Sequence, residues 1–183
     1  MDAKDKIFKA ALKLINDSEK PESITTRRIA AKAGVNVAMV NYYYQSKENL
    51  LTQAVGSLMA NIINPILTDA SRAKDAKTRL RDILLATADA AFAYYGASKI
   101  AISAELKAGC MNSCRMIMPL LREIFADYGE ERLNIVSLQL MLPFHHIMLE
   151  TELYNGYLST DFFDKQKRDR TIAQIIDCTL RDA

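Results

Sequence analysis

Apolar residues recur at every third or fourth position through most of the chain, which is the spacing of one face of an α-helix. The first such segment carries Ile7, Ala11 and Leu14. Segments of this kind, separated by polar stretches and glycines, predict an all-α fold of about nine helices without a convincing strand or internal repeat. The predicted helices cover residues 4–17, 26–33, 37–44, a segment after Ser46, 77–95, 98–108, 113–128, 130–154 and 161–181.

Several residue types mark where these helices begin and end. Thr25, Asn36 and Ser46 each precede a predicted helix, where a short polar side chain can accept a hydrogen bond from a free backbone N–H group. Gly34 follows the second helix, at the position that favours a left-handed backbone. Pro65 is expected to kink or end the fourth helix, because proline lacks the N–H group that a helix interior needs.

Length and composition limit the domain organisation. The 183 residues suffice for one small N-terminal unit and one larger helical body. We expect the division to give residues 1–48 and 49–183, with a polar linker at 71–77. Half of the residues are apolar, and only six Gly and four Pro occur, which favours long helices over a turn-rich β protein.

The net charge of +2 hides an uneven distribution. Residues 25–47 contain four Lys or Arg and no acid, whereas residues 51–183 contain 15 bases and 16 acids. A basic block on a near-neutral body indicates one end that binds a polyanion, and a solvated basic helix face is the equally simple alternative. No apolar run reaches the length of a membrane span and no apolar signal core follows the N-terminus, so we expect a cytoplasmic protein without membrane contact.

Three cysteines cannot form an even disulfide framework, and we expect them to be reduced. The spacing of Cys110 and Cys114 places both thiols on one face if the segment is helical. Together with His145 and His146, these thiols could form a metal or redox sensor. The spacing is not that of a zinc finger, so ordinary core packing is the simpler interpretation. No cofactor and no bound metal are expected.

The most informative stretch is residues 25–50. It contains two short predicted helices joined by a tight turn, in which Gly34 permits the turn and Val35 fills the angle between the helices. The second helix exposes small and polar side chains, so it can enter a DNA major groove about 12 Å wide. Helix N-termini, lysine and tyrosine hydroxyl groups can hold the flanking phosphates.

This stretch resembles the signature of the TetR family of bacterial transcription regulators. The pattern T-x-x-x-I-A-x-x-A-G-V runs from Thr25 to Val35, and an aromatic cluster and Ser46-Lys47-Glu48 follow it. The resemblance implies an N-terminal three-helix DNA-binding domain with a helix-turn-helix, and a larger helical C-terminal domain for ligand binding and dimerisation. Asn41 departs from the tyrosine that many members carry, so the base preference does not follow from the family.

The resemblance also implies which residues touch double-stranded operator DNA. Residues at the start of the second helix, on the recognition helix and just after it match contact positions. They are Thr26, Arg27, Val37, Ala38, Met39, Asn41, Tyr42, Tyr43 and Lys47. Val40 and Tyr44 are expected in the core instead, with Tyr44 under the first helix, and Arg28 and Lys32 are either contacts or solvated charges.

Two further sites are implied for the C-terminal body. The last two predicted helices are expected to pair with a second subunit in a four-helix interface, and the stripe on the final helix is Ile172, Ile175, Ile176 and Thr179. The same stripe could instead serve the subunit's own core. A pocket for a small-molecule effector is expected around Phe92, Tyr95, Met116, Phe144, His145 and Met148, where ordinary core packing is the alternative for each residue.

These features predict a ligand-responsive repressor that acts as a homodimer and leaves its operator when a small molecule binds the C-terminal domain. The alternative is a DNA-bound adaptor whose C-terminal domain binds a protein. An enzyme is not expected, because the sequence has no glycine-rich phosphate loop, no G-x-S-x-G, no H-E-x-x-H and no cluster of metal ligands.

Overall fold

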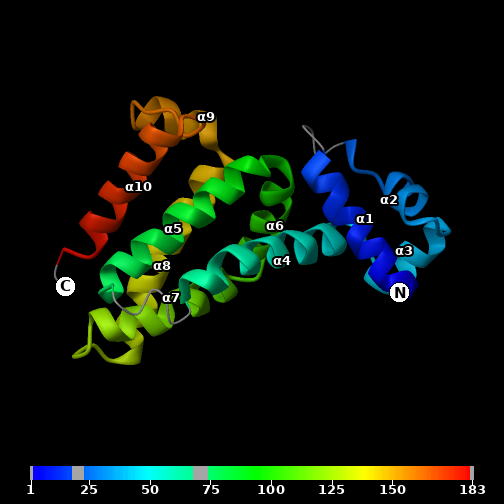
Figure 1. Cartoon of the computed structure of the whole chain (residues 1–183). Helices are drawn as coiled ribbons and strands as arrows, with labels where there is room; N and C mark the ends of the chain where they lie inside the picture. The colour runs from blue at the N-terminus through cyan, green and yellow to red at the C-terminus, as the bar shows by residue number, and fades with distance from the viewer. Residues whose placement is uncertain (1, 18–22, 68–73, 182–183) are drawn as a thin grey trace. The chain divides into compact units, whose positions relative to one another are not determined.

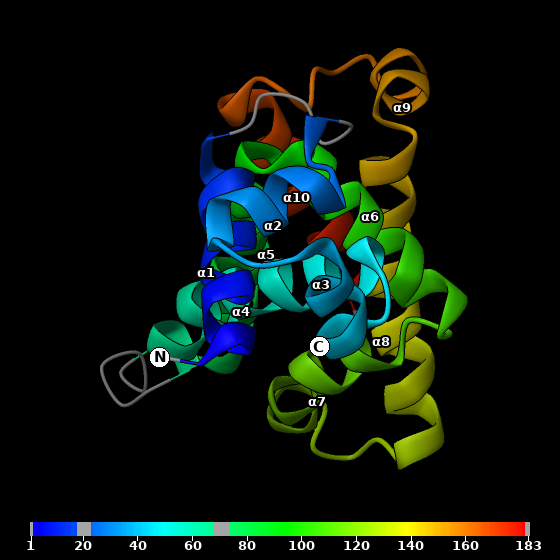
Figure 2. The same cartoon turned by 90° about the vertical axis from the view of Figure 1, so that its right-hand side faces the viewer.

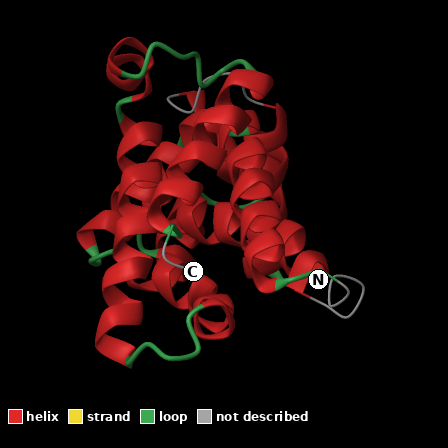
Figure 3. Cartoon of the chain, turned by 90° about the vertical axis from the view of Figure 1, so that its left-hand side faces the viewer, coloured by secondary structure: helices red, strands yellow, loops and turns green. Residues whose placement is uncertain are grey.

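The computed structural model describes residues 2–17, 23–67 and 74–181, and all regular elements within them are α-helices (Figures 1 and 3). The expected all-α fold is confirmed. The helices are α1 (Ala3–Asp17), α2 (Thr26–Ala33), α3 (Val37–Tyr44), α4 (Lys47–Leu67), α5 (Ala76–Ala93), α6 (Tyr95–Lys107), α7 (Met111–Ile124), α8 (Glu130–Leu149), α9 (Thr151–Tyr157) and α10 (Lys165–Thr179). Residues 71–73 of the linker predicted at 71–77 lie outside the described residues, and α5 begins at Ala76.

The described chain divides into two compact units. The first contains Met1–Ala60 and Ala93–Ala101, and the second contains Asn61–Phe92 and Ile102–Ala183. Helix α6 therefore begins in the first unit and ends in the second.

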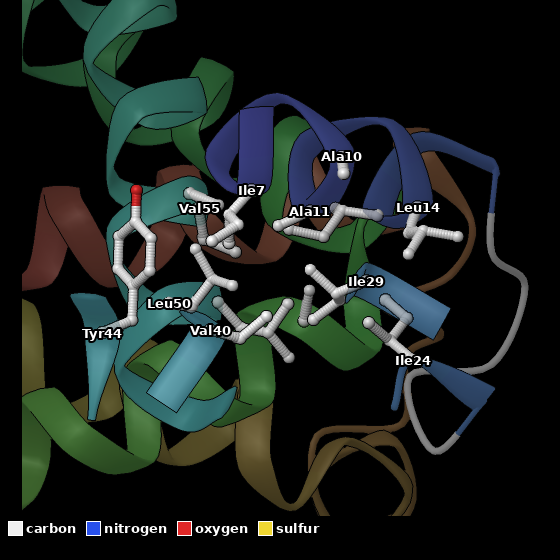
Figure 4. Close-up of a cluster of buried hydrophobic side chains, with 14 of the residues drawn as sticks. Ile7, Ala10, Ala11, Leu14, Ile24, Ile29, Val40, Tyr44, Leu50 and Val55 are labelled. Atoms are coloured by element: carbon white, nitrogen blue, oxygen red, sulfur yellow. The ribbon is translucent and has the colours of Figure 1, made fainter. Parts of the chain in front are cut away.

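The first unit is built on one apolar core (Figure 4). Ile7 and Ala11 of α1, Ile29 of α2, Val40 of α3 and Leu50 of α4 are all fully buried in it. Each helix contributes the apolar face that its spacing predicts, so the short helices α2 and α3 are stabilised mainly by packing rather than by their own length.

Helix α8 lies at the centre of the second unit and packs against α7, α9 and α10. It runs between α7 at one end and α9 at the other (Figure 2). Its buried residues include Leu133, Leu140 and Ile147. Arg168 of α10 is almost fully buried and donates to Asp89 of α5 at 2.5 Å, which ties the last helix to the rest of the unit.

Several helix boundaries differ from the predictions. The segment expected at 130–154 is divided at Glu150, whose backbone (φ −117°, ψ 44°) leaves the helical region, and this adds a tenth helix among the described residues. Gly96, expected to end a helix, lies in the first turn of α6, because the preceding helix α5 already ends at Ala93. Pro65 lies near the end of α4, which extends two residues further to Leu67.

Candidate functional site

The helix-turn-helix of the first unit is fixed by side-chain caps and a left-handed turn. Thr25 Oγ1 accepts from the backbone N–H of Arg28 at 3.2 Å, and Asn36 Oδ1 accepts from that of Ala38 at 3.0 Å. Gly34 has a φ of 66°, which a side chain would strain. The predicted caps and turn are confirmed, and together they set the angle at which α3 follows α2.

Helix α3 has one face in the core and one face in solvent. Val40 and Tyr44 are buried, and the Tyr44 hydroxyl donates to the Lys4 carbonyl of α1 at 3.0 Å, so both are core residues as predicted. Burial, followed by the nearby carboxylates of Asp5 and Asp2, raises the Tyr44 pKa, which keeps this hydroxyl protonated as a donor.

The opposite face of α3 carries exposed side chains that can reach a nucleic acid. Tyr42 is 80% exposed and packs edge-on against Tyr43 with ring centroids 5.1 Å apart. Among the predicted DNA contacts, Arg27, Val37, Ala38, Asn41 and Tyr42 are exposed, whereas Thr26, Met39, Tyr43 and Lys47 are half-buried. Met39 and Tyr43 pack against the core of the unit, so only part of each side chain is available to DNA.

The turn between α3 and α4 was not anticipated from the sequence. Gln45 has a φ of 66°, and the Ser46 N–H donates to the Tyr44 carbonyl across it at 2.7 Å. Ser46 Oγ accepts from the Asn49 N–H at 3.0 Å, so the predicted cap of α4 is confirmed. Lys47 thus stands in the first turn of α4, at the helix end whose dipole favours an anion.

The basic residues of this unit differ in what they contact within the chain. Arg28 Nη1 donates to the Ser23 carbonyl at 2.6 Å, and Lys32 Nζ lies 3.0 Å from the Asp17 carboxylate. Both side chains therefore stabilise the ends of α1 and α2. Lys47 lies 3.7 Å from Glu48, a loose contact between a half-buried lysine and an exposed carboxylate.

Residues 7–54 match the model of the family "Bacterial regulatory proteins, tetR family". The chain carries the DNA-binding domain of the TetR family. The match spans α1 to the first part of α4, and so includes the two caps, the Gly34 turn and the exposed face of α3. The resemblance inferred from the sequence is confirmed for residues 7–54, the part of the chain that the family model covers.

Solved structures extend the similarity of fold over nearly the whole chain. FadR from Thermus thermophilus, a TetR-family transcriptional repressor in complex with lauroyl-CoA, is 18% identical with a TM-score of 0.71, and 97% of this chain and 91% of that chain are covered. The fatty acid degradation regulator FadR from Bacillus halodurans is 13% identical with a TM-score of 0.62, and 98% and 95% are covered. No curated protein sequence gave a significant match.

The second unit contains a buried polar cluster at the corner between α6 and α7. Cys110 Sγ lies 3.0 Å from His145 Nδ1, and Ser113 Oγ lies 3.3 Å from His145 Nε2. The Glu105 carboxylate accepts from the Ser113 N–H at 2.9 Å and so caps α7 from α6. The cluster joins three consecutive helices, α6, α7 and α8.

Burial dominates the ionisation of this cluster. It lowers the His145 pKa against a weaker opposing effect of Glu105, so the ring is neutral. Burial, followed by the neighbouring Cys114 thiol, raises the Cys110 pKa to about 12. A buried thiol that holds its proton is a poor nucleophile. No group of three or more His, Cys, Asp or Glu residues suited to a metal ion occurs within the described ranges.

The residues predicted to line an effector pocket do not all occupy similar positions. Tyr95 belongs to the first unit, and the other predicted residues belong to the second. His145 and Met148 are buried, whereas Phe92, Met116 and Phe144 are partly exposed. Phe92 stacks on Phe162 with ring centroids 6.3 Å apart.

The stripe predicted to pair with a second subunit is divided between two roles. Ile172 and Ile176 are 2% and 0% exposed in the single chain, so they serve the core of their own unit and the prediction is revised for these two residues. Ile175 and Thr179 instead line a groove on the outer face of α8, α9 and α10. A stripe at helical spacing cannot by itself distinguish these two faces.

This groove has a volume of about 600 Å³ and is lined by side chains without formal charge. None of its thirteen described lining residues is Asp, Glu, Lys or Arg, in a chain of which 25% is charged. His146 lies in this groove while His145 faces the buried cluster, so the two adjacent histidines point in different directions, as expected on a helix.

No helix in the described part of the chain is long and apolar enough to cross a membrane.

Proposed function

We propose that this protein is a ligand-responsive repressor that binds its operator as a homodimer in the cytoplasm and releases it when a small molecule binds the second unit. The exposed face of α3 carries this proposal, since it presents Asn41 and Tyr42 on a domain of the TetR family. The similarity of fold to a ligand-bound repressor over nearly the full chain supports the proposal that a ligand controls DNA binding. In this proposal the predicted DNA contacts keep their roles.

For the effector we propose a mainly apolar molecule, with long-chain acyl thioesters as the first class to test. The Thermus thermophilus relative binds lauroyl-CoA, which supports this class. Met116, Phe144 and Met148 would provide adaptable apolar contacts beside the polar cluster of His145. A ligand releases DNA only through a difference in its affinity for the two states of the dimer.

The test begins with selection of a preferred duplex from a random pool, followed by fluorescence anisotropy on that duplex. Addition of lauroyl-CoA is expected to release the DNA, whereas CoA alone is not. Release by neither acyl-CoA nor another small molecule would favour the alternative, a DNA-bound adaptor that binds a protein. If no duplex is selected from the pool, the proposal that the protein is a DNA-binding regulator is rejected.

We propose that the charge-free groove of α8, α9 and α10 is covered by the same groove of a second copy. Depletion of charged residues is typical of the buried centre of an interface, and a two-fold axis brings identical surfaces together.

Ile175→Glu places a charge in the groove and is expected to give folded monomers in sedimentation velocity. Ile176→Glu places it in the unit's own core and is expected to unfold the chain.

A dimeric Ile175→Glu variant would place the interface on another surface. In that case operator binding should also be retained, because the linkage of two half-sites by one dimer supports its affinity.

A further inference from the structure

The corner between α6 and α7 holds a cysteine in a backbone conformation that cysteine rarely adopts. Gly109 and Cys110 follow one another with φ values of 80° and 62°, both in the left-handed region. Glycine enters this region without strain, whereas a residue with a side chain is uncommon there. Residues held in such a conformation gather at functional sites and switch regions. The position of Cys110 therefore calls for a chemical reason.

Cys110 lies beside a second thiol at a distance that a disulfide can bridge. The Cys114 N–H donates to the Cys110 carbonyl at 3.2 Å, so the two residues are one helical turn apart, with Cα atoms separated by about 6 Å. Disulfides join residues whose Cα atoms lie roughly 4.4–6.8 Å apart. The Cys114 thiol also interacts directly with the Cys110 thiol. A bond between them requires rotation of side chains rather than movement of helices.

His145 supplies the base that such a bond needs. Its Nδ1 lies 3.0 Å from Cys110 Sγ, and the ring is neutral, so Nδ1 can take the thiol proton. The Ser113 hydroxyl at Nε2 fixes the orientation of the ring, and the negative charge of Glu105 favours the protonated ring that proton transfer produces. The protonated Cys110 thiol is unreactive by itself, so its reaction depends on this neighbour.

We propose that Cys110, Cys114 and His145 form a thiol–disulfide switch that responds to hydroperoxides. Cys114 is 6% exposed and Cys110 is 0% exposed, so the peroxide meets Cys114 first. A sulfur–oxygen bond forms at Cys114, the peroxide O–O bond breaks, and the thiol proton leaves with the alcohol, which gives a sulfenic acid.

In the second step Cys110 Sγ attacks the sulfenic sulfur of Cys114 while His145 Nδ1 takes its proton. The sulfenic oxygen leaves with that proton as water, and the sulfur–sulfur bond is complete. In total the two thiols lose two protons and two electrons, and the hydroperoxide is reduced to an alcohol and water.

The disulfide removes the hydrogen bond that joins the start of α7 to α8. Cys110 Sγ no longer carries a proton, so the buried Nδ1 of His145 is left without its donor, which destabilises the junction of α6, α7 and α8. We expect this change to weaken DNA binding, an effect that rests on the proposed function. Oxidation would then act beside the small-molecule effector as a second route to release.

Peptide masses of the full chain test the disulfide without DNA. Trypsin cleavage after Lys107 and Arg115 places both cysteines in the single peptide 108–115, and Cys178 in another. After treatment with tert-butyl hydroperoxide and alkylation, this peptide is expected to be two hydrogen atoms lighter than its reduced form and to carry no alkyl group. Cys114→Ser should prevent this product and His145→Gln should slow its formation. A fully alkylated or oxygenated 108–115 peptide, in a sample whose exposed Cys178 has been oxidised, would overturn the proposal.

Fluorescence anisotropy on the selected duplex tests the consequence. Oxidised wild type is expected to bind about fivefold more weakly or less, and dithiothreitol should restore the affinity. Cys114→Ser is the matched control, because it keeps Cys178 and should retain its affinity in peroxide. A disulfide in a protein of unchanged DNA affinity would overturn the switch. Failure to select any duplex would count against the proposed function alone, because the peptide masses still decide whether the disulfide forms.

Discussion

Cys110 Sγ and His145 Nδ1 lie 3.0 Å apart although 35 residues separate them in the chain. The thiol keeps its proton and the imidazole is neutral, so Cys110 donates to Nδ1 and the remaining ring N–H faces the Ser113 hydroxyl. A donor at this point satisfies a buried acceptor that would otherwise destabilise the junction of α6, α7 and α8.

The first prediction concerns pH. The His145 pKa is lowered in the folded state, so the unfolded chain binds more protons as the pH falls below the ordinary histidine value of about 6.5. The free energy of unfolding is therefore greatest above that value and decreases as the pH falls through the folded pKa. His145→Gln should show a smaller decrease between pH 7.5 and pH 5.5 in urea titrations.

The second prediction concerns the tie between α5 and α10. Asp89→Asn removes the carboxylate that pairs with the buried Arg168 guanidinium. We expect a loss of about 2 kcal/mol in unfolding free energy, below the ~3–5 kcal/mol for a fully buried pair because Asp89 is partly exposed. Asp177→Asn breaks the exposed pair with Arg81 between the same helices and should cost less than about 0.5 kcal/mol. Equal losses would show that the burial of Arg168 is not decisive.

The helix boundaries that were predicted correctly depend on local interactions. Thr25, Gly34 and Asn36 act on backbone groups within a few residues, so the bounds of α2 and α3 were predicted correctly. The break at Glu150 carries no glycine or proline, and it depends on how the chain after α8 packs.

The candidate sites divide in the same way. Asn41 and Tyr42 were selected through the resemblance to the family, and both are exposed on α3. Ile176 is buried in the core whereas Ile175 lines the groove, and this difference depends on which helix lies against each side of α10. The pairing of Cys110 with His145 likewise depends on long-range packing. Periodicity identifies an apolar face but not the surface that covers it.

The third prediction concerns phosphate binding by Lys47. Lys47→Ala should weaken binding to all duplexes alike and reduce the slope of log affinity against log salt by about one unit for each half-site. Lys32→Ala is the matched control, because its charge is already paired with Asp17, and it should change the slope less. Affinities measured by anisotropy at several salt concentrations give both slopes. A wild-type slope for Lys47→Ala would mean that this lysine does not touch phosphate.

The last prediction concerns base reading by Asn41. Its side chain is exposed on α3, one turn beyond the exposed Val37, on the side away from the buried Val40. A carboxamide there can donate its N–H to adenine N7 and accept from the adenine N6 amino group in the same contact, whereas a phenol cannot make both bonds. Asn41→Ala should therefore cost about 1–3 kcal/mol on the preferred duplex and relax the choice at one base pair in each half-site. Contact with a phosphate alone would instead weaken every sequence equally, as expected for Lys47→Ala. Binding selection on the wild type and both variants, compared position by position, distinguishes the two roles: unchanged sequence preferences in Asn41→Ala would assign this side chain to the DNA backbone.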